Sequence, residues 1–498
     1  MNSFSIKKDI YNYIFILILL LTAGFCSFYN LQKTSLANWD EGLYANIVAE
    51  MNGAPKLIAI SNDQPWLEKP ILGFWLHLTG TNLFGLNNFG LRFMGSLLFI
   101  GSALLLYLIL QKFYSIYTSF FVSLAFTICP IFFFAHMIRS ADFESYFIFF
   151  TILSFWLYIV SWKKPKLFFL VGLTLGLSFM IRGYISLLIF AAIYFHLLLY
   201  QKYKIYSLQI ITYSLIAFLL VILPWHIYAI ISYPKEFFNS YLNYHFLQRI
   251  IRPLEGHKGD YWFYLDFLYY QLGIFALWLL IGFNYFVWKL YKKNNHIDGL
   301  WLIWILSFII PLQIMGTKIV WYIIALTPAC FLFIASIVDG LTKLKSKKIK
   351  IIAIFFLIIT GLSYYNYSLK IIFGHIFFPP ALPLDSLTNY IHQHKITPKT
   401  IITFSSQDSF GGPAANFQWN KLKTCELIKI EDKSNLNIYL KKSDNSIIIL
   451  TDLEGYKIIK LADYLNNWDG EVLNYFQDDW LDEGVPIIMR SRLHSLRM

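Results

Sequence analysis

Charged residues are scarce in this sequence. Of its 498 residues, 14% are charged and 57% are hydrophobic, which is more apolar material than a soluble domain of this length can bury. The scarcity excludes an ordinary soluble protein and predicts a polytopic membrane protein. The net charge of +12 does not indicate a nucleic-acid partner, because the basic residues form short clusters between apolar runs, where the positive-inside rule places them.

Other signals are missing as well. The four cysteines have no paired spacing, so the sequence predicts neither a disulfide framework nor a cysteine metal site. The sequence contains no Walker or Rossmann loop, which argues against a nucleotide-binding domain. The first apolar run has no small-residue cleavage site and is followed by many more runs, so we expect it to stay as a membrane anchor.

The apolar runs themselves are continuous and approach the roughly 20 residues that a helix needs to cross a bilayer. Continuous runs favour helices over a β-barrel, whose strands alternate apolar and polar residues. We therefore expect about eleven transmembrane helices. Their predicted ranges are 11–29, 89–110, 117–135, 143–161, 167–181, 184–200, 208–231, 263–288, 299–315, 319–338 and 351–371.

Two regions outside these spans are too long to be simple connections. Residues 30–88 contain "EGLYANIVAEM" and "PILGFWLHLTGTNLFG", whose spacing and aromatic content predict amphipathic helices on the membrane surface. After residue 374 the hydropathy falls. There "KTIITFSS", "NSIIILTD" and "VPIIMRSR" are typical of short strands, and 456–468 is typical of a helix. The sequence thus predicts a transmembrane domain at 1–374 and a small α/β domain at 375–498.

The basic clusters fall at every second connection, so all of them can face the cytoplasm together. The N-terminus is then inside, and the region 375–498 is outside. The other connections lie on the outer face and hold most of the remaining charges. They are "NWDEGLYANIVAEM", "PWLEKP", "HMIRSAD", "MIRGY", "NYHFLQRIIRPLEGHKGDYW" and "GTKIVWY".

Carboxylates and cations therefore meet on one membrane face. The carboxylates are Asp40, Glu68 and Asp142, and the cations are Lys69, Arg139, Arg182, Arg249 and Lys318. Such a set suits a reaction that deprotonates a hydroxyl and releases a phosphate, because a carboxylate can act as the base and cations can neutralise the phosphate. Simpler interpretations stay open: acids at a helix start, a surface Glu68–Lys69 pair, and an Arg139–Asp142 pair at three-residue spacing.

Taken in order, several motifs resemble the membrane glycosyltransferases of the GT-C superfamily. They are "DEGLYANIVAEM", "PWLEKPILGFWL", "LFGLNNFGLRF", "RSAD", "HFLQR" and "KIVWYIIALTP". The group they resemble contains the bacterial lipid A aminoarabinose transferases and the dolichyl-phosphate-mannose protein mannosyltransferase-like enzymes. The resemblance covers roughly residues 10–340 and implies transfer of a sugar from a polyprenyl-phosphate carrier to an acceptor hydroxyl on the non-cytoplasmic face.

The resemblance also implies roles for single residues. Asp40 would be the leading catalytic carboxylate, with Glu41 beside it. The carrier phosphate would be held by Lys69, Arg249 and Lys318, with Tyr322 as a further contact. From the set of charges on this face we add Asp142 as a further acid and Arg182 as a further phosphate ligand. Glu68 and His245 match positions that can hold a divalent metal, although a lone histidine near an interface is also a common structural hydrogen-bonding residue.

Two positions depart from the family pattern. Leu43 precedes Tyr44 where the aminoarabinose enzymes often have an arginine, and Arg182–Gly183 stands where Lys-Gly is frequent. We predict an inverting enzyme of the bacterial inner membrane that uses undecaprenyl phosphate as its carrier. The predicted acceptor is lipid A or another envelope glycolipid. A protein O-glycosyltransferase is the alternative of the same class, and a transporter or flippase of lipid-linked substrates is the alternative of another class.

Overall fold

The computed structural model describes residues 3–37, 40–51, 53–133, 136–200, 207–280, 282–283 and 296–377, together with five strands between 400 and 490. The contacts divide the chain into two units. The first comprises Met1–Leu31 and Glu50–Phe377, and the second comprises Gln32–Ala49 and Phe378–Met498.

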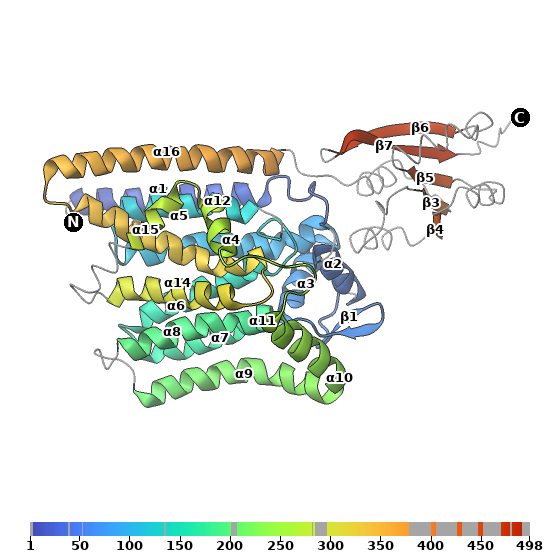
Figure 1. Cartoon of the computed structure of the whole chain (residues 1–498), viewed down its shortest axis with the longest axis horizontal. Coiled ribbons are helices and arrows are strands. Elements are labelled where there is room, and N and C mark those ends of the chain that lie inside the picture. Colours follow the sequence, from blue (N-terminus) through green and yellow to red (C-terminus); the bar gives the residue numbers. More distant parts are fainter. Residues whose placement is uncertain are drawn as a thin grey trace, which may run out of the picture. The chain divides into compact units, whose positions relative to one another are not determined.

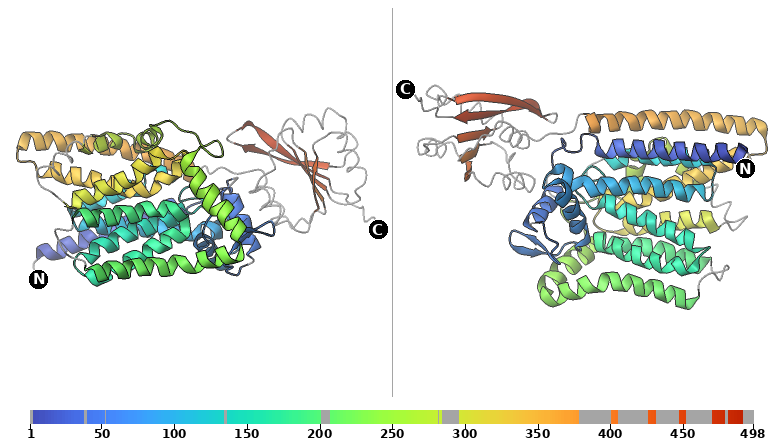
Figure 2. Two further views of the ribbon diagram at one scale, coloured as in Figure 1. Left: turned by 60° about the horizontal axis from the view of Figure 1, so that its bottom comes forward. Right: turned by 180° about the vertical axis from the view of Figure 1, so that it is seen from behind.

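The first unit is a bundle of long helices that lie side by side (Figures 1 and 2). These helices are α1 (Ser3–Phe28), α4 (Asn88–Gln111), α5 (Ile116–Thr127), α6 (Glu144–Ser161), α7 (Phe168–Arg182), α8 (Leu187–Leu199), α9 (Leu208–Ser232), α14 (His296–Ile314), α15 (Thr327–Thr342) and α16 (Lys347–Phe377). α16 and α9 lie at opposite edges of the bundle in Figure 1. In the apolar segment of each helix, only 11% of the residues of α16 and 22% of those of α9 are buried inside the protein. Such low burial is expected of helices that face lipid.

Among the described residues, nine helical stretches are long and apolar enough to cross a membrane. The predicted polytopic helical fold is confirmed, and two details explain the difference from eleven spans. The stretch Pro165–Leu199 contains both predicted spans, 167–181 and 184–200. The chain reverses at the 3-10 turn η3 (Gly183–Ser186), so α7 and α8 are antiparallel: the ring of Phe168 at the start of α7 lies 5.9 Å from that of Tyr194 near the end of α8. The predicted span 263–288 begins with α12 (Phe263–Leu272), and much of its second half lies outside the described residues.

Local sequence explains where several helices begin and how closely two of them pack. The side chains of Asn87 and Ser115 accept hydrogen bonds from amides in the first turns of α4 and α5, as N-cap residues do. Gly172 and Gly176 line one face of α7. A Cβ at Gly172 would lie 1.8 Å from the carbonyl oxygen of Ser214, so the two glycines let α7 and α9 approach backbone to backbone.

The predicted surface loop contains an element that the sequence analysis missed. β1 (Ala59–Ser61) pairs antiparallel with β2 (Gln64–Trp66) in a hairpin. The two turn residues, Asn62 and Asp63, have φ values of +52° and +58°, and Asn and Asp tolerate this region. The carboxylate of Glu50 accepts hydrogen bonds from both of their amides, at 3.0 and 3.4 Å. The hairpin thus fixes the start of the "PWLEKP" segment.

The short elements of the first unit gather at one end of the bundle, opposite the N-terminus of α1 (Figures 1 and 2). The labelled ones are β1, α3 (Leu72–Phe84), α10 (Pro234–Glu236) and α11 (Arg249–Ile251). Between α10 and α11 the chain forms a π-helix, η5 (Phe237–Gln248), and η6 (Val320–Leu326) is a 3-10 helix that leads into α15. This end of the bundle holds the site described below.

The second unit contains a five-stranded mixed sheet in the order β4-β3-β5-β7-β6. The strands are β3 (Thr400–Phe404), β4 (Glu426–Ile430), β5 (Ile447–Thr451), β6 (Gly470–Asp478) and β7 (Leu481–Arg490). β3 is parallel to β4 and β5, whereas β7 is antiparallel to β5 and β6. All three predicted strand segments are strands, and the predicted helix at 456–468 lies outside the described residues. The second unit also contains α2 (Asp40–Glu50) up to Ala49.

Candidate functional site

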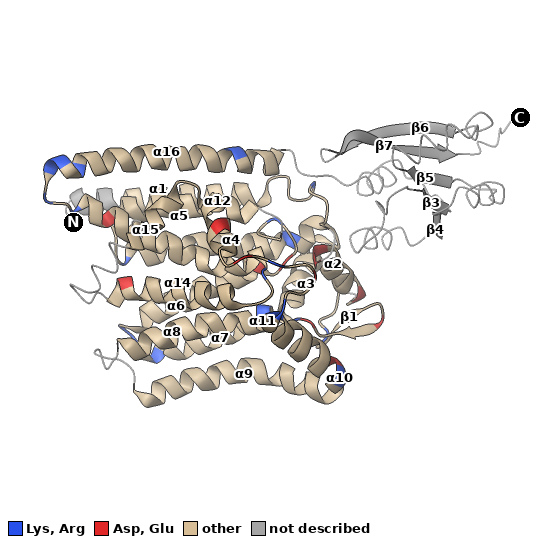
Figure 3. Ribbon diagram, viewed as in Figure 1, with Lys and Arg blue, Asp and Glu red and all other residues tan. Residues whose placement is uncertain are grey.

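Charged residues of the bundle lie mainly at helix ends and in connections, and the middle parts of the helices contain few of them (Figure 3). At the end that carries β1, α10 and α11, two groups of polar side chains come together. One is built around Arg249 and the other around Asp142 and Glu144. Most residues in both groups come from the connections that the sequence analysis placed on a single membrane face.

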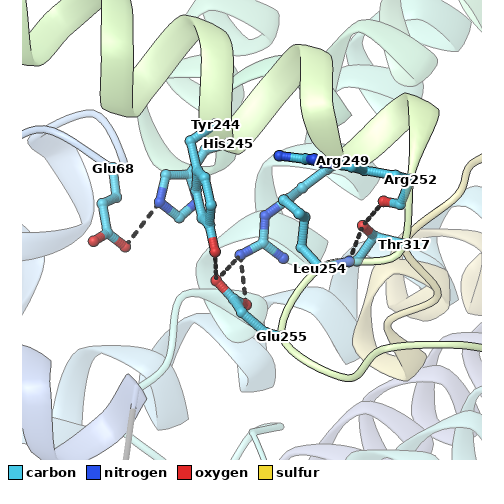
Figure 4. Close-up of polar contacts among 8 residues, drawn as sticks. All are labelled: Glu68, Tyr244, His245, Arg249, Arg252, Leu254, Glu255 and Thr317. Carbon is cyan, nitrogen blue, oxygen red and sulfur yellow. Dashed lines mark hydrogen bonds and ion pairs between the residues drawn. The ribbon is translucent and has the colours of Figure 1, made fainter.

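Glu68 and His245 lie next to each other at one side of the first group (Figure 4). Glu68 Oε2 lies 3.1 Å from His245 Nε2, and both side chains are partly exposed. Glu68 comes from the segment after the β1–β2 hairpin, and His245 comes from η5. The predicted surface pair of Glu68 with Lys69 is therefore not the contact that Glu68 makes here, since its carboxylate pairs with His245.

Tyr244 and Arg249 both donate to the carboxylate of Glu255 (Figure 4). Arg249 Nη2 lies 2.8 and 3.0 Å from the two carboxylate oxygens, and the Tyr244 hydroxyl lies 3.1 Å from one of them. The two donors are five residues apart, which is the hydrogen-bond spacing of a π-helix and brings them to one side of the continuous helical segment formed by η5 and α11. Burial and the Glu255 carboxylate raise the pKa of Tyr244, so its hydroxyl remains a donor at neutral pH.

The segment Gly316–Lys318 holds this group in place through its backbone. Its three amides donate to the carbonyls of Ile250, Arg249 and His257, at 2.8, 3.0 and 3.0 Å. The Thr317 hydroxyl donates to the Arg252 carbonyl and accepts from the Leu254 amide. A Cβ at Gly316 would lie 2.5 Å from the Arg252 nitrogen, so only glycine permits this approach.

Lys318 turns its ammonium group back toward α14. Its Nζ donates to the carbonyls of Leu312 and Gln313 at the end of that helix, and it lies 5.7 Å from the centre of the Tyr264 ring. Burial lowers the pKa of this ammonium group. Carbonyls at a helix C-terminus attract cations, which explains the position of Lys318 without a ligand. Its predicted contact with a phosphate stays a prediction.

The second group is centred on a buried ion pair. Arg182 Nη2, at the end of α7, lies 2.5 Å from Glu144 Oε1, at the start of α6, and both side chains are almost fully buried. The Arg182 guanidinium also lies over the ring of Tyr322, 5.6 Å from its centre. Glu144 interacts electrostatically with Asp142 and Lys69 in addition. The predicted phosphate ligands Arg182 and Tyr322 are thus neighbours, and Arg182 has a buried carboxylate of its own.

Asp142 is held by Ser140 and His136. The Ser140 hydroxyl donates to Asp142 Oδ2 at 2.7 Å, and His136 Nδ1 lies 3.2 Å from the same oxygen. His136 has a φ of +65°, and its ring lies 4.2 Å from that of Trp321. The alternative pairing of Arg139 with Asp142 is wrong. Arg139 instead donates to carbonyls at the end of α1, where a helix C-terminus favours a cation.

The two groups are linked by the chain segment from Thr317 to Tyr322. The amide of Thr317 donates to the carbonyl of Arg249 at 3.0 Å, and Tyr322, five residues further on, lies under the guanidinium of Arg182. Lys69 belongs to the second group, because it interacts with Glu144 and its Nζ lies 5.6 Å from the centre of the Phe143 ring. Cations and carboxylates are therefore interleaved at one end of the bundle, an arrangement able to hold a phosphate and to accept a proton.

Asp40 and Glu41 begin α2 in the second unit. Glu41 Oε2 accepts a hydrogen bond of 2.7 Å from the amide of Ala37, which satisfies one backbone donor near the start of the helix. The catalytic roles of Asp40, Glu41 and Asp142 stay predictions, as do the phosphate contacts of Lys69 and Arg249.

Glu68 and His245 are spaced as two ligands of one metal ion would be. Oxygen and nitrogen ligands lie roughly 2.0–2.2 Å from zinc, so two of them on one ion are about as far apart as the 3.1 Å that separates these atoms. A hydrogen-bonded pair has the same separation, so the divalent metal that the family resemblance implies stays a prediction.

Four members of the site were missed in the sequence. They are His136, Glu144, Tyr244 and Glu255. Glu144 could have been found, because an acid at the first position of an apolar span is costly unless it has a partner. The other three lie beside residues that were identified, but nothing in the sequence alone separates them from ordinary loop residues.

Comparison with known proteins finds similarity to membrane glycosyltransferases. Residues 68–228 match the family described as dolichyl-phosphate-mannose-protein mannosyltransferase. An undecaprenyl phosphate-alpha-4-amino-4-deoxy-L-arabinose arabinosyl transferase of Wigglesworthia glossinidia brevipalpis is 28% identical over 320 residues, which are 63% of this chain and 56% of that protein. The chain thus matches little more than half the length of this relative. A protein of Aquifex aeolicus is 26% identical over 390 residues, 77% of this chain and 75% of its own length.

Two solved structures share the fold. ArnT from Cupriavidus metallidurans, in a crystal structure bound to undecaprenyl phosphate, superposes with a TM-score of 0.65 at 13% identity, covering 97% of this chain and 98% of that one. The Archaeoglobus fulgidus oligosaccharyltransferase has a TM-score of 0.52 at 12% identity, with 91% and 70% covered. At these identities the likeness concerns the fold.

Proposed function

We propose that this chain is a membrane glycosyltransferase of the GT-C superfamily and that it transfers a sugar from a polyprenyl-phosphate carrier to an acceptor in the cell envelope. The observation that carries the proposal is the group of cations at one end of a lipid-facing bundle: Arg182 lies over Tyr322, Lys69 lies over Phe143, and Arg249 is hydrogen-bonded through its backbone to the segment that leads to Tyr322. The polyprenyl chain of a lipid carrier can stay in the bilayer while its phosphate reaches the end of the bundle where these side chains lie. The absence of a Walker or Rossmann loop in the sequence agrees with a lipid-linked donor.

The proposed reaction is a direct displacement at the anomeric carbon. The oxygen of the acceptor hydroxyl forms a bond to the anomeric carbon. At the same time the bond between this carbon and the phosphate oxygen breaks, and its electron pair leaves with the polyprenyl phosphate. Asp40 takes the proton of the hydroxyl, and the cations neutralise the charge that develops on the phosphate. The configuration at the anomeric carbon is inverted. A divalent cation held by Glu68 and His245 would supply further positive charge beside the phosphate.

For the acceptor we propose lipid A or another envelope glycolipid, with undecaprenyl phosphate as the carrier. The support is similarity to the arabinosyl transferases, which extends over 63% of this chain in the Wigglesworthia relative. The match of residues 68–228 to the protein mannosyltransferase family favours a second candidate, a protein hydroxyl acceptor. Both candidates use the same site, since each acceptor presents a hydroxyl group.

Mass spectrometry of the cell envelope separates the two acceptors. Lipid A and total protein glycans are compared between cells that express the chain and cells that express Asp40→Asn at the same membrane level. We expect a sugar-sized mass on lipid A that is absent with Asp40→Asn. Loss of a protein-bound glycan instead would assign the acceptor to protein, and the absence of any change in lipids, glycans and polyprenyl-linked sugars would contradict transfer altogether.

The chain is a multi-pass membrane protein, and we place the site on the periplasmic face of the bacterial inner membrane. The basic clusters at alternate connections support this orientation. A cysteine at position 68 should react with a membrane-impermeant thiol reagent added from the periplasmic side, whereas one at position 347, where α16 begins, should not. Labelling at 347 but not at 68 would reverse the orientation.

A further inference from the structure

Glu255 occupies the position in the first group that an anionic ligand would take (Figure 4). Its two carboxylate oxygens accept hydrogen bonds from Arg249 Nη2, and one of them also accepts from the Tyr244 hydroxyl. Both donors come from one continuous helical segment, η5 with α11, whereas Glu255 comes from the connection that follows. Two fixed donors therefore converge on a carboxylate that a separate segment delivers.

A carboxylate and a phosphate make the same demands on such donors. Both are anions with several acceptor oxygens, and both form strong charge-assisted hydrogen bonds with a guanidinium group. The Tyr244 hydroxyl adds a neutral donor that serves either anion. Two anions cannot share Arg249 without strong repulsion, because like charges a few ångströms apart oppose each other. Glu255 already occupies Arg249 Nη2 and the Tyr244 hydroxyl, so a phosphate that takes these same two donors must displace Glu255.

The local backbone allows this displacement. Glu255 has a φ of +53° and is followed by Gly256 with a φ of +76°. No heavy atom lies within 4 Å of the place where a Cβ of Gly256 would be, and the side chain of Glu255 is 42% exposed. The flanking residues, in contrast, are fixed by Thr317 and by the amide of Lys318. Glu255 can thus leave while Arg249 stays in place.

We propose that Glu255 is an internal competitor of the donor phosphate: in the absence of donor its carboxylate fills the oxyanion site formed by Tyr244 and Arg249, and donor binding expels it. The inference rests on the proposed function and adds Tyr244 as a donor-binding residue. It explains why the predicted phosphate ligand Arg249 already has a carboxylate partner. With competition of this kind, the apparent dissociation constant of the phosphate equals its intrinsic value divided by the fraction of molecules in which Glu255 has left the site.

The test is the binding of a sugar-free polyprenyl monophosphate to the purified full-length chain in detergent, measured by calorimetry. Glu255→Gln keeps the size of the side chain and removes its charge, so the phosphate should bind about 3- to 10-fold more tightly than to the wild type. Adding Tyr244→Phe to Glu255→Gln should weaken binding again by about 3- to 10-fold, because one donor is lost. Glu236→Gln on α10 removes the same charge outside the cluster and should leave the affinity unchanged.

The outcomes separate this inference from the proposed function. Weaker or equal binding by Glu255→Gln, with the wild type binding normally and both proteins equally folded by size exclusion, would overturn the competition and leave the donor assignment intact. If Glu236→Gln also bound the phosphate more tightly, the change in affinity would follow from the net charge of the protein, and the competition by Glu255 would be overturned. If neither the wild type nor any variant binds the monophosphate, the proposed function itself fails.

Discussion

Replacing Asp40 by asparagine is expected to lower the rate of sugar transfer by about 10²- to 10⁴-fold, the range that a positioned proton acceptor contributes. Asparagine has the same shape but cannot take the proton from the acceptor hydroxyl. Asp40 is the first residue of α2. The rate is measured as release of polyprenyl phosphate by the purified chain in lipid nanodiscs with saturating donor and acceptor.

The matched control for this experiment is Glu41→Gln. The Glu41 carboxylate accepts the Ala37 amide at 2.7 Å, and a glutamine oxygen can accept the same bond. We expect less than a 10-fold change in rate if Glu41 has this structural role alone. Equal losses in both variants would show that the acidic pair acts together. An Asp40→Asn protein that retains its full rate would remove Asp40 from the chemistry.

The second large effect is expected on stability. Arg182→Met should destabilise the bundle by about 3 to 5 kcal/mol, because it leaves Glu144 as a buried carboxylate without its partner. Adding Glu144→Gln should restore part of this loss, since the unpaired charge is then removed as well. The measurement is thermal unfolding of the detergent-solubilised protein, followed by tryptophan fluorescence.

Lys343→Met is the control for the Arg182 experiment. Lys343 Nζ lies 2.6 Å from Asp339 Oδ2 in a pair at four-residue spacing, but the lysine side chain is 70% exposed. Exposed pairs contribute little, so its loss should change stability by less than about 1 kcal/mol. If Arg182→Met were no more harmful than Lys343→Met, the buried pair would not be a structural element of the site.

The sequence was sufficient to predict the class of fold. In lipid, the backbone N–H and C=O groups of a continuous apolar run can all be hydrogen-bonded within that run only if it forms a helix. This constraint acts on each segment separately. The predicted strands at 399–406 and 445–452 rest on local patterns that the sheet retains in β3 and β5. The β1–β2 hairpin escaped prediction because its strands are three residues long and depend on Glu50, which precedes them in the sequence.

The pairing of site residues was much harder to predict than their gathering on one face. Topology alone brought Glu68, Arg182 and Arg249 to a common side. Which acid meets which base depends on tertiary geometry. Arg139 is only three residues from Asp142, yet it binds carbonyls of α1 that lie more than one hundred positions earlier in the chain. Likewise, Tyr244 and Arg249 share one anion because η5 is a π-helix, and the sequence carries no clear signal for that geometry.

The most direct test of the account is the fate of the carrier–sugar bond. The purified wild-type chain in nanodiscs receives undecaprenyl phosphate linked to an isotope-labelled sugar, together with lipid A. The account predicts that undecaprenyl phosphate is released as the label appears on lipid A, and that neither product forms without the protein. Intact carrier–sugar throughout, together with movement of the labelled lipid across the bilayer when the chain is placed in sealed vesicles, would contradict transfer and identify a transporter.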